Sequence, residues 1–101
     1  YVQKTMQENN CSKDEAYSII SYELRGNRLA NVSDIFGSVT DCKCQGYWGH
    51  DREYWKIEGK MEKEAFANMF ESSMGIQYKA EDMKKYFPNA YYVFKELLED
   101  I

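Results

Sequence analysis

Two short segments of the sequence contain most of the side chains that could take part in chemistry. Residues 47–55, YWGHDREYW, contain four aromatic side chains and the single histidine of the chain, His50. In residues 62–71, EKEAFANMFE, three polar residues share one helix face at i, i+4 and i+7: Glu64, Asn68 and Glu71. An imidazole and carboxylates can bind a metal ion or transfer protons. The chemistry therefore depends on whether folding brings the two segments together.

Each feature also has a purely structural interpretation. A Glu-Asn-Glu stripe at this spacing is typical of the solvent-facing side of an amphipathic helix. A lone histidine in an aromatic loop is more often a hydrogen-bonded packing residue than a catalyst. Trp48, Tyr54 and Trp55 are large aromatics of the kind that pack under irregular loops. Residue types and spacing alone therefore favour packing over function.

The histidine and cysteine counts limit the sites that can be built. A Ser-His-Asp or Cys-His arrangement would have to use His50, and the sequence has no phosphate-binding glycine loop or dinucleotide fingerprint. Cys42 and Cys44 could supply two thiol ligands to a metal ion, but structural zinc takes four ligands, and only His50 and Cys11 could complete the set. Three cysteines cannot all pair internally, so we expect reduced thiols, with Cys42 and Cys44 at a turn.

The composition fits one domain over residues 1–101 and excludes two classes of partner. The chain is 44% hydrophobic and 16% aromatic, enough for a single core. Thirteen basic against seventeen acidic residues give a net charge of -4 without a basic stripe, so we expect no nucleic-acid partner. No stretch approaches the ~20 apolar residues that cross a bilayer, so we expect a soluble protein and no membrane partner. Because the chain starts with Tyr1 rather than Met, we expect a fragment of a longer chain.

Helical patterns lie on both sides of residues 27–59. The capping-box sequence SKDE at residues 12–15 predicts a helix that starts there and ends near Gly26. A second long helix is predicted from Lys60 to Met74, with one wide apolar face. That face comprises Met61, Ala65, Phe66, Met69 and Phe70.

Pro88 separates two further predicted helices. Because a residue before proline disfavours the α region, the shorter helix, over Ala80 to Tyr86, should end ahead of it. The last helix should run from Pro88 to Glu99. Its predicted buried stripe comprises Ala90, Phe94, Leu97, Leu98 and Ile101.

Residues 27–60 show little periodicity and contain four glycines. Ser33 and Asp34 predict the start of a short helical turn, and a hairpin over residues 39–47 is an alternative to an irregular loop. We therefore predict a mainly α fold. It would be a small helical domain with an irregular, aromatic-rich loop region, or a short β-hairpin, between the first and second long helices.

Four segments together resemble a known family. The succession SDIFGSVT, GYWGHDREYW, EKEAFANMFE and KKYFPNAYYVFKELLEDI resembles the C-terminal part of a zincin-like metallopeptidase domain found at the ends of phage minor head proteins and prophage toxin-like proteins. The resemblance covers residues 30–101, and its most specific part is W-G-H followed by E-x-F-A-x-x-F-E. Zincins hold zinc with two histidines of an HExxH helix and a third ligand from a later helix.

The resemblance implies a role for each candidate residue. Glu64 would be the third metal ligand, and Asn68 and Glu71 would orient a ligand. His50 and Tyr54 would be the catalytic candidates, and either His50, or Tyr47 and Tyr54, would stabilise the oxyanion formed during peptide hydrolysis. No HExxH occurs in this sequence, so we expect no activity from this chain alone and zinc only in a longer parent chain that supplies HExxH.

A non-enzymatic role is the alternative. Tyr and Trp are favoured anchors of interfaces, so Trp48 and Trp55 could make loop 47–55 the contact surface of a structural or protein-interaction module. The expected partners are a peptide or protein substrate of the parent, other phage structural proteins, or a second copy of the chain. The expected location is the cytoplasm of a bacterial host or the virion.

Overall fold

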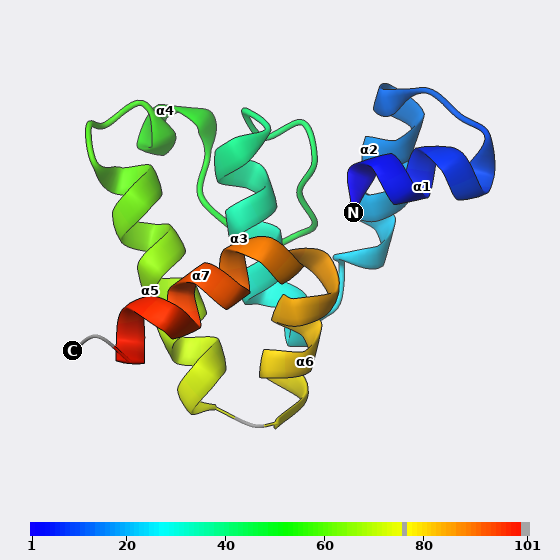
Figure 1. The fold of residues 1–101 in the computed structure, drawn as a ribbon. Helices are drawn as coiled ribbons and strands as arrows, with labels where there is room; N and C mark the ends of the chain where they lie inside the picture. Colours follow the sequence, from blue (N-terminus) through cyan, green and yellow to red (C-terminus); the bar gives the residue numbers. More distant parts are fainter. Residues whose placement is uncertain (76, 100–101) are drawn as a thin grey trace.

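The computed structural model describes residues 1–75 and 77–99, and these residues form helices and connecting loops without a β-strand. In chain order the elements are α1 (Val2–Asn9), α2 (Lys13–Glu23), the 3-10 turn η1 (Asn27–Leu29), α3 (Ala30–Val39), α4 (Arg52–Trp55), α5 (Lys60–Met74), α6 (Gln77–Tyr86) and α7 (Pro88–Glu99). The mainly α fold predicted from the sequence is confirmed (Figure 1). In the described part of the chain, no helix has both the length and the apolar character needed to cross a membrane.

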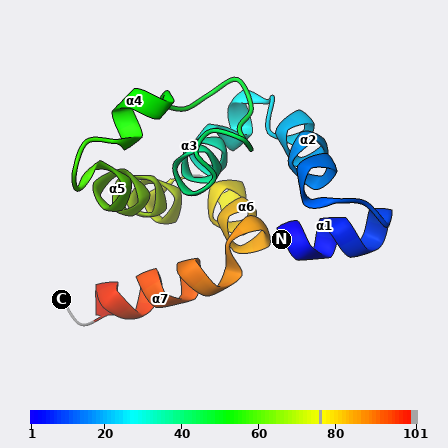
Figure 2. The same cartoon turned by 90° about the horizontal axis from the view of Figure 1, so that it is seen from above.

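Helix α3 lies at the centre of the molecule. Figure 2 shows it between α2 on one side and α5 on the other, with α6 beside it. It buries every residue from Val32 to Ser38, so it has almost no solvent-facing side in that stretch. Helices α6 and α7 follow α5 and pack on it and on each other. The core comprises Ile20, Leu24, Val32, Ile35, Phe36, Cys44, Met69, Met83, Tyr86, Tyr91 and Phe94.

Helix α2 begins as its sequence predicts. The Glu15 N–H donates to the Ser12 hydroxyl over 3.2 Å, and the Ser12 N–H donates to the Glu15 carboxylate over 3.3 Å. This reciprocal pair is a capping box, which satisfies two backbone donors that the helix itself cannot. The helix ends at Glu23, three residues before the predicted stop at Gly26.

Helices α1 and α4 are not predicted from the sequence. Both are short, and helices of this length depend on packing more than on their own propensity. Helix α1 is held through Tyr1, whose ring centroid lies 4.5 Å from that of Tyr86 and whose hydroxyl donates to Glu23 over 2.9 Å. Helix α4 is a single turn that is capped by Asp51, whose carboxylate accepts from the Tyr54 N–H over 2.9 Å.

The prediction that Ser33 and Asp34 start a helical turn is wrong, because α3 begins at Ala30, directly after η1. Both residues are buried inside the helix instead of capping it. The Ser33 hydroxyl donates to the Trp48 carbonyl over 2.6 Å and accepts from the Gly46 N–H over 2.9 Å. Contacts with a later loop therefore determine the position of these polar residues, rather than the local capping preference.

Residues 40–51 form an irregular loop, and the hairpin considered for residues 39–47 does not form. Asp41 and Cys42 have positive φ angles of 55° and 62°. The Cys42 N–H donates back to the Gly37 carbonyl over 2.9 Å. The chain therefore turns directly after α3, and the residues that would start the hairpin are not extended.

The predicted C-terminal helices are confirmed in position. Helix α5 covers Lys60–Met74, α7 covers Pro88–Glu99, and α6 ends at Tyr86 ahead of the proline. Helix α6 begins at Gln77, three residues before the predicted start at Ala80.

The predicted buried stripe of α7 is only partly correct. Phe94 is buried as expected, but Ala90 and Leu97 are exposed, and Tyr91 is the second buried residue. Leu98 is half-buried against the core. Ile101 lies outside the described residues. The stripe differs because the buried side of α7 depends on its packing against α5 and α6, which the periodicity of α7 alone does not determine.

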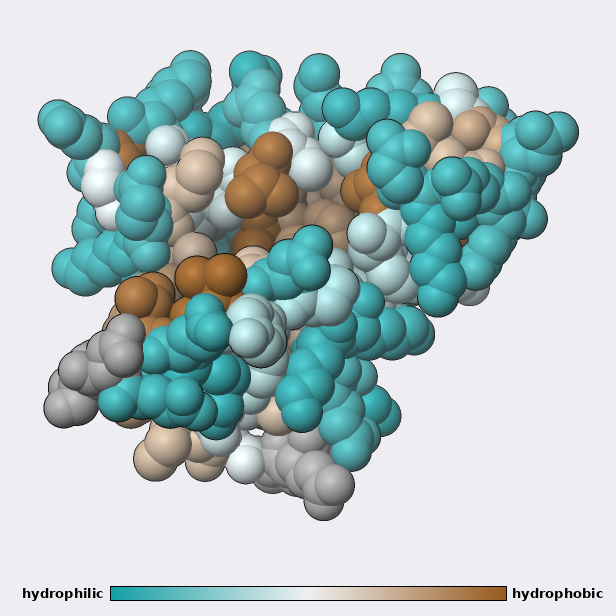
Figure 3. All heavy atoms as spheres, in the orientation of Figure 1, coloured by the Kyte–Doolittle hydropathy of each residue, from teal (hydrophilic) through white to brown (hydrophobic). Residues whose placement is uncertain are grey.

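Helix α5 faces its neighbours differently from the prediction. Of its predicted apolar face only Met69 is buried, while Phe66 and Phe70 are 47% and 44% exposed. The side that carries Glu64 and Asn68 is turned toward α3. Hydrophobic side chains consequently reach the surface over α5 and α7, and Figure 3 shows such side chains where α7 runs.

Candidate functional site

Asp34 is the centre of a polar cluster between α3 and α5. It is only 7% exposed. Its Oδ1 accepts from the His50 backbone N–H over 3.1 Å and lies 2.9 Å from the His50 ring Nδ1. Its Oδ2 accepts from the Asn68 side-chain amide over 2.8 Å. Because a carboxylate faces Nδ1, the ring proton belongs on Nδ1 and the Nε2 lone pair is available for another partner.

The loop before His50 is shaped by Ser33 and by glycine. The Ser33 hydroxyl bridges the Gly46 N–H and the Trp48 carbonyl, which fixes both sides of the turn. Gly49 has a φ of 133°, a conformation that L side chains rarely adopt. A Cβ there would also lie 3.3 Å from the Asp34 Cα. The close approach of this backbone to α3 is what places the imidazole against the carboxylate.

Aromatic rings hold the imidazole from the other direction. The Tyr54 ring stacks on the His50 ring with a centroid distance of 3.7 Å and an interplanar angle of 12°. Trp55 meets both rings edge-on, at 5.3 Å from His50 and 5.1 Å from Tyr54. Helix α4 is a single turn that begins directly after its Asp51 cap. Tyr54 and Trp55, at its end, therefore both lie beside His50. The orientation of the imidazole is therefore fixed by Asp34 and by stacking.

Glu64 and Asn68 complete the cluster from α5. The Tyr54 hydroxyl donates to the Glu64 carboxylate. The Asn68 amide donates to Asp34 and also to the Glu64 carbonyl over 2.9 Å, and its oxygen accepts from Asn31 over 2.8 Å. The solvent-facing interpretation of the stripe is therefore wrong for Glu64 and Asn68, which face α3.

The cluster has the composition of a metal site. One donor atom each from Asp34, His50 and Glu64 lie within 4.8 Å of one another, and this is the group of possible metal ligands found in the described residues. The three residues border a pocket of about 440 Å³ that also includes Trp48 and Asn68. The donors are one imidazole nitrogen and two carboxylate oxygens, which zinc accepts.

The other predicted site residues lie at the edge of the cluster. Trp48 lines the pocket and is 46% exposed, while Trp55 is half-buried against the rings. Glu71 is exposed at the far end of the pocket, where the Lys79 ammonium lies 3.5 Å from its carboxylate. Glu71 therefore pairs with Lys79 and does not belong to the group of possible metal ligands around His50.

The thiols do not join this site. Cys44 is fully buried, and burial raises the pKa of its thiol to about 11. The Cys42 sulfur lies 3.5 Å from the His50 carbonyl, not from its ring. No cysteine belongs to the group of possible ligands found in the described residues, so the thiol-ligated site considered for Cys42 and Cys44 has no geometric support.

Sequence reasoning missed Asp34 and Asn31. Both lie on α3, one helical turn apart, and both are connected through Asn68. Their signal in the sequence is weak but present: in ANVSDIF the polar side chains of Asn31 and Asp34 recur at i and i+3, with Ser33 between them, among apolar residues. A buried helix with such a pair needs polar partners on its neighbour, and α5 supplies them.

The hydrogen bond between Tyr54 and Glu64 predicts a specific pH dependence. The bond to Glu64, followed by burial, raises the pKa of Tyr54 from 10.0 to about 12. Because the folded-state pKa is above the unfolded value, the phenol's contribution to stability is complete below pH 10 and is lost as the pH rises through 12. We expect Glu64→Gln to bring the pKa of Tyr54 back toward 10, as measured by NMR titration of ring-labelled tyrosine. Glu62→Gln, on the exposed side of the same helix, is the matched control, and an unchanged pKa in Glu64→Gln would contradict the assignment.

Comparison of this chain with models of protein families, with curated proteins and with solved structures gives no match. The geometry of the cluster is therefore the evidence that bears on function.

Proposed function

We propose that this chain supplies part of the metal site of a zincin-like metallopeptidase domain of the kind found in phage minor head proteins and prophage toxin-like proteins, and that it is catalytically incomplete by itself. The convergence of Asp34, His50 and Glu64 donor atoms within 4.8 Å, at the border of a pocket, is the observation that supports this proposal. The predicted third ligand, Glu64, comes from α5. His50 comes from a loop whose position relative to α5 cannot be predicted from its sequence pattern.

The donor atoms of the cluster are of kinds that zinc binds, but there are too few of them to complete its coordination. The Asp34 Oδ1 already accepts from the His50 backbone N–H and lies against the His50 ring Nδ1. It therefore orients the imidazole in the manner of a carboxylate that supports a metal-bound histidine. His50 Nε2 and the Glu64 carboxylate remain as direct donors. A zinc ion takes four ligands, or three and a water in a catalytic site. At least one further protein ligand must come from elsewhere, as the absence of HExxH from this sequence also requires.

The residues of this chain have distinct roles in such a site. Asp34 fixes the tautomer of His50, and Tyr54 orients the Glu64 carboxylate through its hydroxyl. Asn68 holds Asp34 and so couples α5 to the histidine. When bound, zinc would polarise a peptide carbonyl and acidify a water molecule.

A zinc titration tests this proposal directly. We expect this chain to bind Zn²⁺ weakly, and we expect His50→Ala or Glu64→Ala to reduce the affinity by about tenfold or more, because each removes a direct donor. Isothermal calorimetry with Zn²⁺ as the only titrant measures this. Glu62→Ala is the matched control, since Glu62 is an exposed carboxylate of the same helix outside the pocket.

Two outcomes are decisive. If His50→Ala and Glu64→Ala bind Zn²⁺ as well as Glu62→Ala does, the cluster is not the zinc site. If a longer natural chain that contains HExxH binds zinc tightly and stoichiometrically, and Glu64→Ala abolishes that binding, then Glu64 is the third ligand.

A protein-interaction module is the second candidate, and one observation favours it. Tyr47 and Trp48 are 74% and 46% exposed on the loop, and Phe66, Phe70 and Leu97 are exposed on α5 and α7. Exposed aromatic and apolar side chains of this kind suit a phage structural partner or a second copy of the chain. Sedimentation velocity separates self-association from a monomer. For either function we propose the cytoplasm of a bacterial host or the virion as the location.

A further inference from the structure

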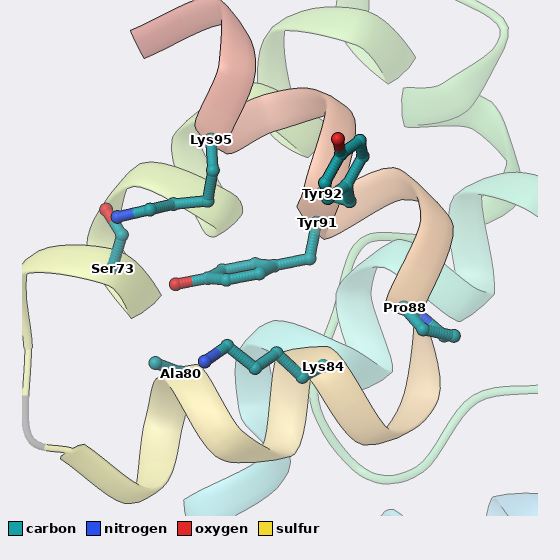
Figure 4. Close-up of a pocket in the computed structure, with 7 residues that line it drawn as sticks. All are labelled: Ser73, Ala80, Lys84, Pro88, Tyr91, Tyr92 and Lys95. Carbon is teal, nitrogen blue, oxygen red and sulfur yellow. The ribbon is translucent and has the colours of Figure 1, made fainter. Parts of the chain in front are cut away.

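A second pocket lies between the end of α5, helix α6 and helix α7, and it shares no lining residue with the pocket at His50. Its volume is about 600 Å³, within the range of roughly 300–1,000 Å³ that holds small organic ligands. Its walls include the apolar surfaces of Ala80, Pro88 and the Tyr91 ring (Figure 4). Neither the candidate metal site nor loop 47–55 contributes a residue to this pocket.

Two ammonium groups stand at one end of this pocket. In Figure 4 the side chains of Lys84 and Lys95 lie on either side of the Tyr91 side chain, and their nitrogens point in the same direction as the Tyr91 hydroxyl. The Lys84 ammonium lies 5.8 Å from the centroid of the Tyr91 ring. Neither lysine takes part in the ion pairs found among the described residues. This end of the pocket therefore presents two ammonium groups that pair with no carboxylate among the described residues.

The hydroxyl of Tyr91 also lies in this pocket and can bind a ligand. Tyr91 is only 4% exposed, yet within residues 1–75 and 77–99 its hydroxyl has no hydrogen-bond partner. The hydroxyl oxygen is not one of the fully buried polar atoms, so it opens into the pocket and can donate to or accept from a ligand there. Figure 4 shows the hydroxyl directed along the pocket toward Ser73. Ser73 donates its own proton to the Phe70 carbonyl over 2.8 Å and can only accept from Tyr91 or a ligand at this end.

The geometry points to a binding site for a small organic anion. Its carboxylate or phosphate group lies between the Lys84 and Lys95 ammonium groups and accepts a hydrogen bond from the Tyr91 hydroxyl. Its apolar body packs against Ala80, Pro88 and the Tyr91 ring. Charge-assisted hydrogen bonds to two ammonium groups provide recognition, and the burial of apolar surface provides affinity. This inference does not depend on the metal site.

Titration of the full chain with phenyl phosphate, followed by backbone amide NMR shifts, tests this site. We expect shifts concentrated at Ser73, Ala80, Lys84, Tyr91 and Lys95. The double variant Lys84→Gln/Lys95→Gln should weaken binding by about tenfold or more, because both charged donors are lost. Tyr91→Phe should weaken it by a smaller factor while keeping the ring packing against Phe94 intact.

Matched controls make the outcome unambiguous. Lys85→Gln removes a lysine of the same helix whose ammonium lies over Tyr86 instead, and it should bind phenyl phosphate like the unmodified chain. Benzyl alcohol, which has the ring without the charge, should produce no comparable shifts, and inorganic phosphate should bind more weakly than phenyl phosphate. Shifts scattered over unrelated lysines, or equal affinity of the double variant and Lys85→Gln, would overturn the proposal. Inorganic phosphate binding as tightly as phenyl phosphate would overturn the role of the apolar walls.

Discussion

Asp34→Ala is expected to lower the free energy of unfolding by about 3 kcal/mol, because it leaves three donors without their acceptor in a buried place. These donors are the His50 backbone N–H, the His50 ring Nδ1–H and the Asn68 amide. Some of them would find water at the rim, since His50 is half-buried. Urea unfolding, monitored by circular dichroism, measures the change.

A second variant and a control isolate the cause. Asp34→Asn keeps the shape of the side chain but offers one acceptor instead of two, so we expect a loss of intermediate size. Asp14→Ala removes an exposed carboxylate from the first turn of α2 and should cost only about 0.5 kcal/mol through the helix dipole. If Asp34→Ala costs no more than Asp14→Ala, Asp34 does not organise the cluster.

The effect of Asp34→Ala should also be visible at His50 itself. Without the carboxylate, the imidazole loses the partner that fixes its orientation and tautomer. We therefore expect the ring signals of His50 to broaden or move in NMR spectra, and zinc binding to weaken together with them. Unchanged ring signals would show that stacking on Tyr54 alone positions the imidazole.

Gly46→Ala is expected to be about as damaging, for a steric reason. A Cβ at this position would lie 2.1 Å from the Leu24 carbonyl oxygen and 2.5 Å from its carbon. Leu24 is fully buried, so its backbone has no free space into which to move. Overpacking a core commonly lowers the free energy of unfolding by about 1–3 kcal/mol and sometimes more. We expect Gly46→Ala to lie at the upper end of this range, because the clash is with backbone atoms.

Gly26→Ala is the matched control for this steric effect. A Cβ at Gly26 meets nothing within 4 Å, and the φ of -72° suits any L residue. We expect that variant to be neutral or more stable by about 0.5 kcal/mol, since alanine restricts the unfolded chain. Thermal unfolding should therefore occur at a lower temperature in Gly46→Ala and at an unchanged or higher temperature in Gly26→Ala. Equal effects would mean that the approach of Gly46 to Leu24 is not a constraint on the fold.

Gly46→Ala should disturb the candidate site as well as the core. The Gly46 N–H donates to Ser33, whose hydroxyl also holds the Trp48 carbonyl two residues before His50. A shift of this loop away from α2 therefore moves the imidazole away from Asp34. We expect amide signals of Gly49 and His50 to change in any folded fraction of the variant.

Features that depend only on neighbouring residues could be predicted from the sequence. The capping box at residues 12–15, the helix from Lys60 to Met74 and the interruption at Pro88 all follow from local backbone preferences and are present in the structure. Residue chemistry also singled out His50 and Glu64. These features could be predicted because each depends on a few consecutive residues or one helical period.

The neighbours of those residues could not be predicted, because they depend on how the helices pack. Helix α5 could present either its aromatic side or its Glu64 side to α3. It presents the latter, and Asn68 thereby gives hydrogen-bond partners to Asn31 and to the buried Asp34. Asp34 meets His50 through a loop whose path depends on the close approach of Gly49 to α3. Such pairings depend on the packing of distant segments, and no periodicity within one segment encodes them.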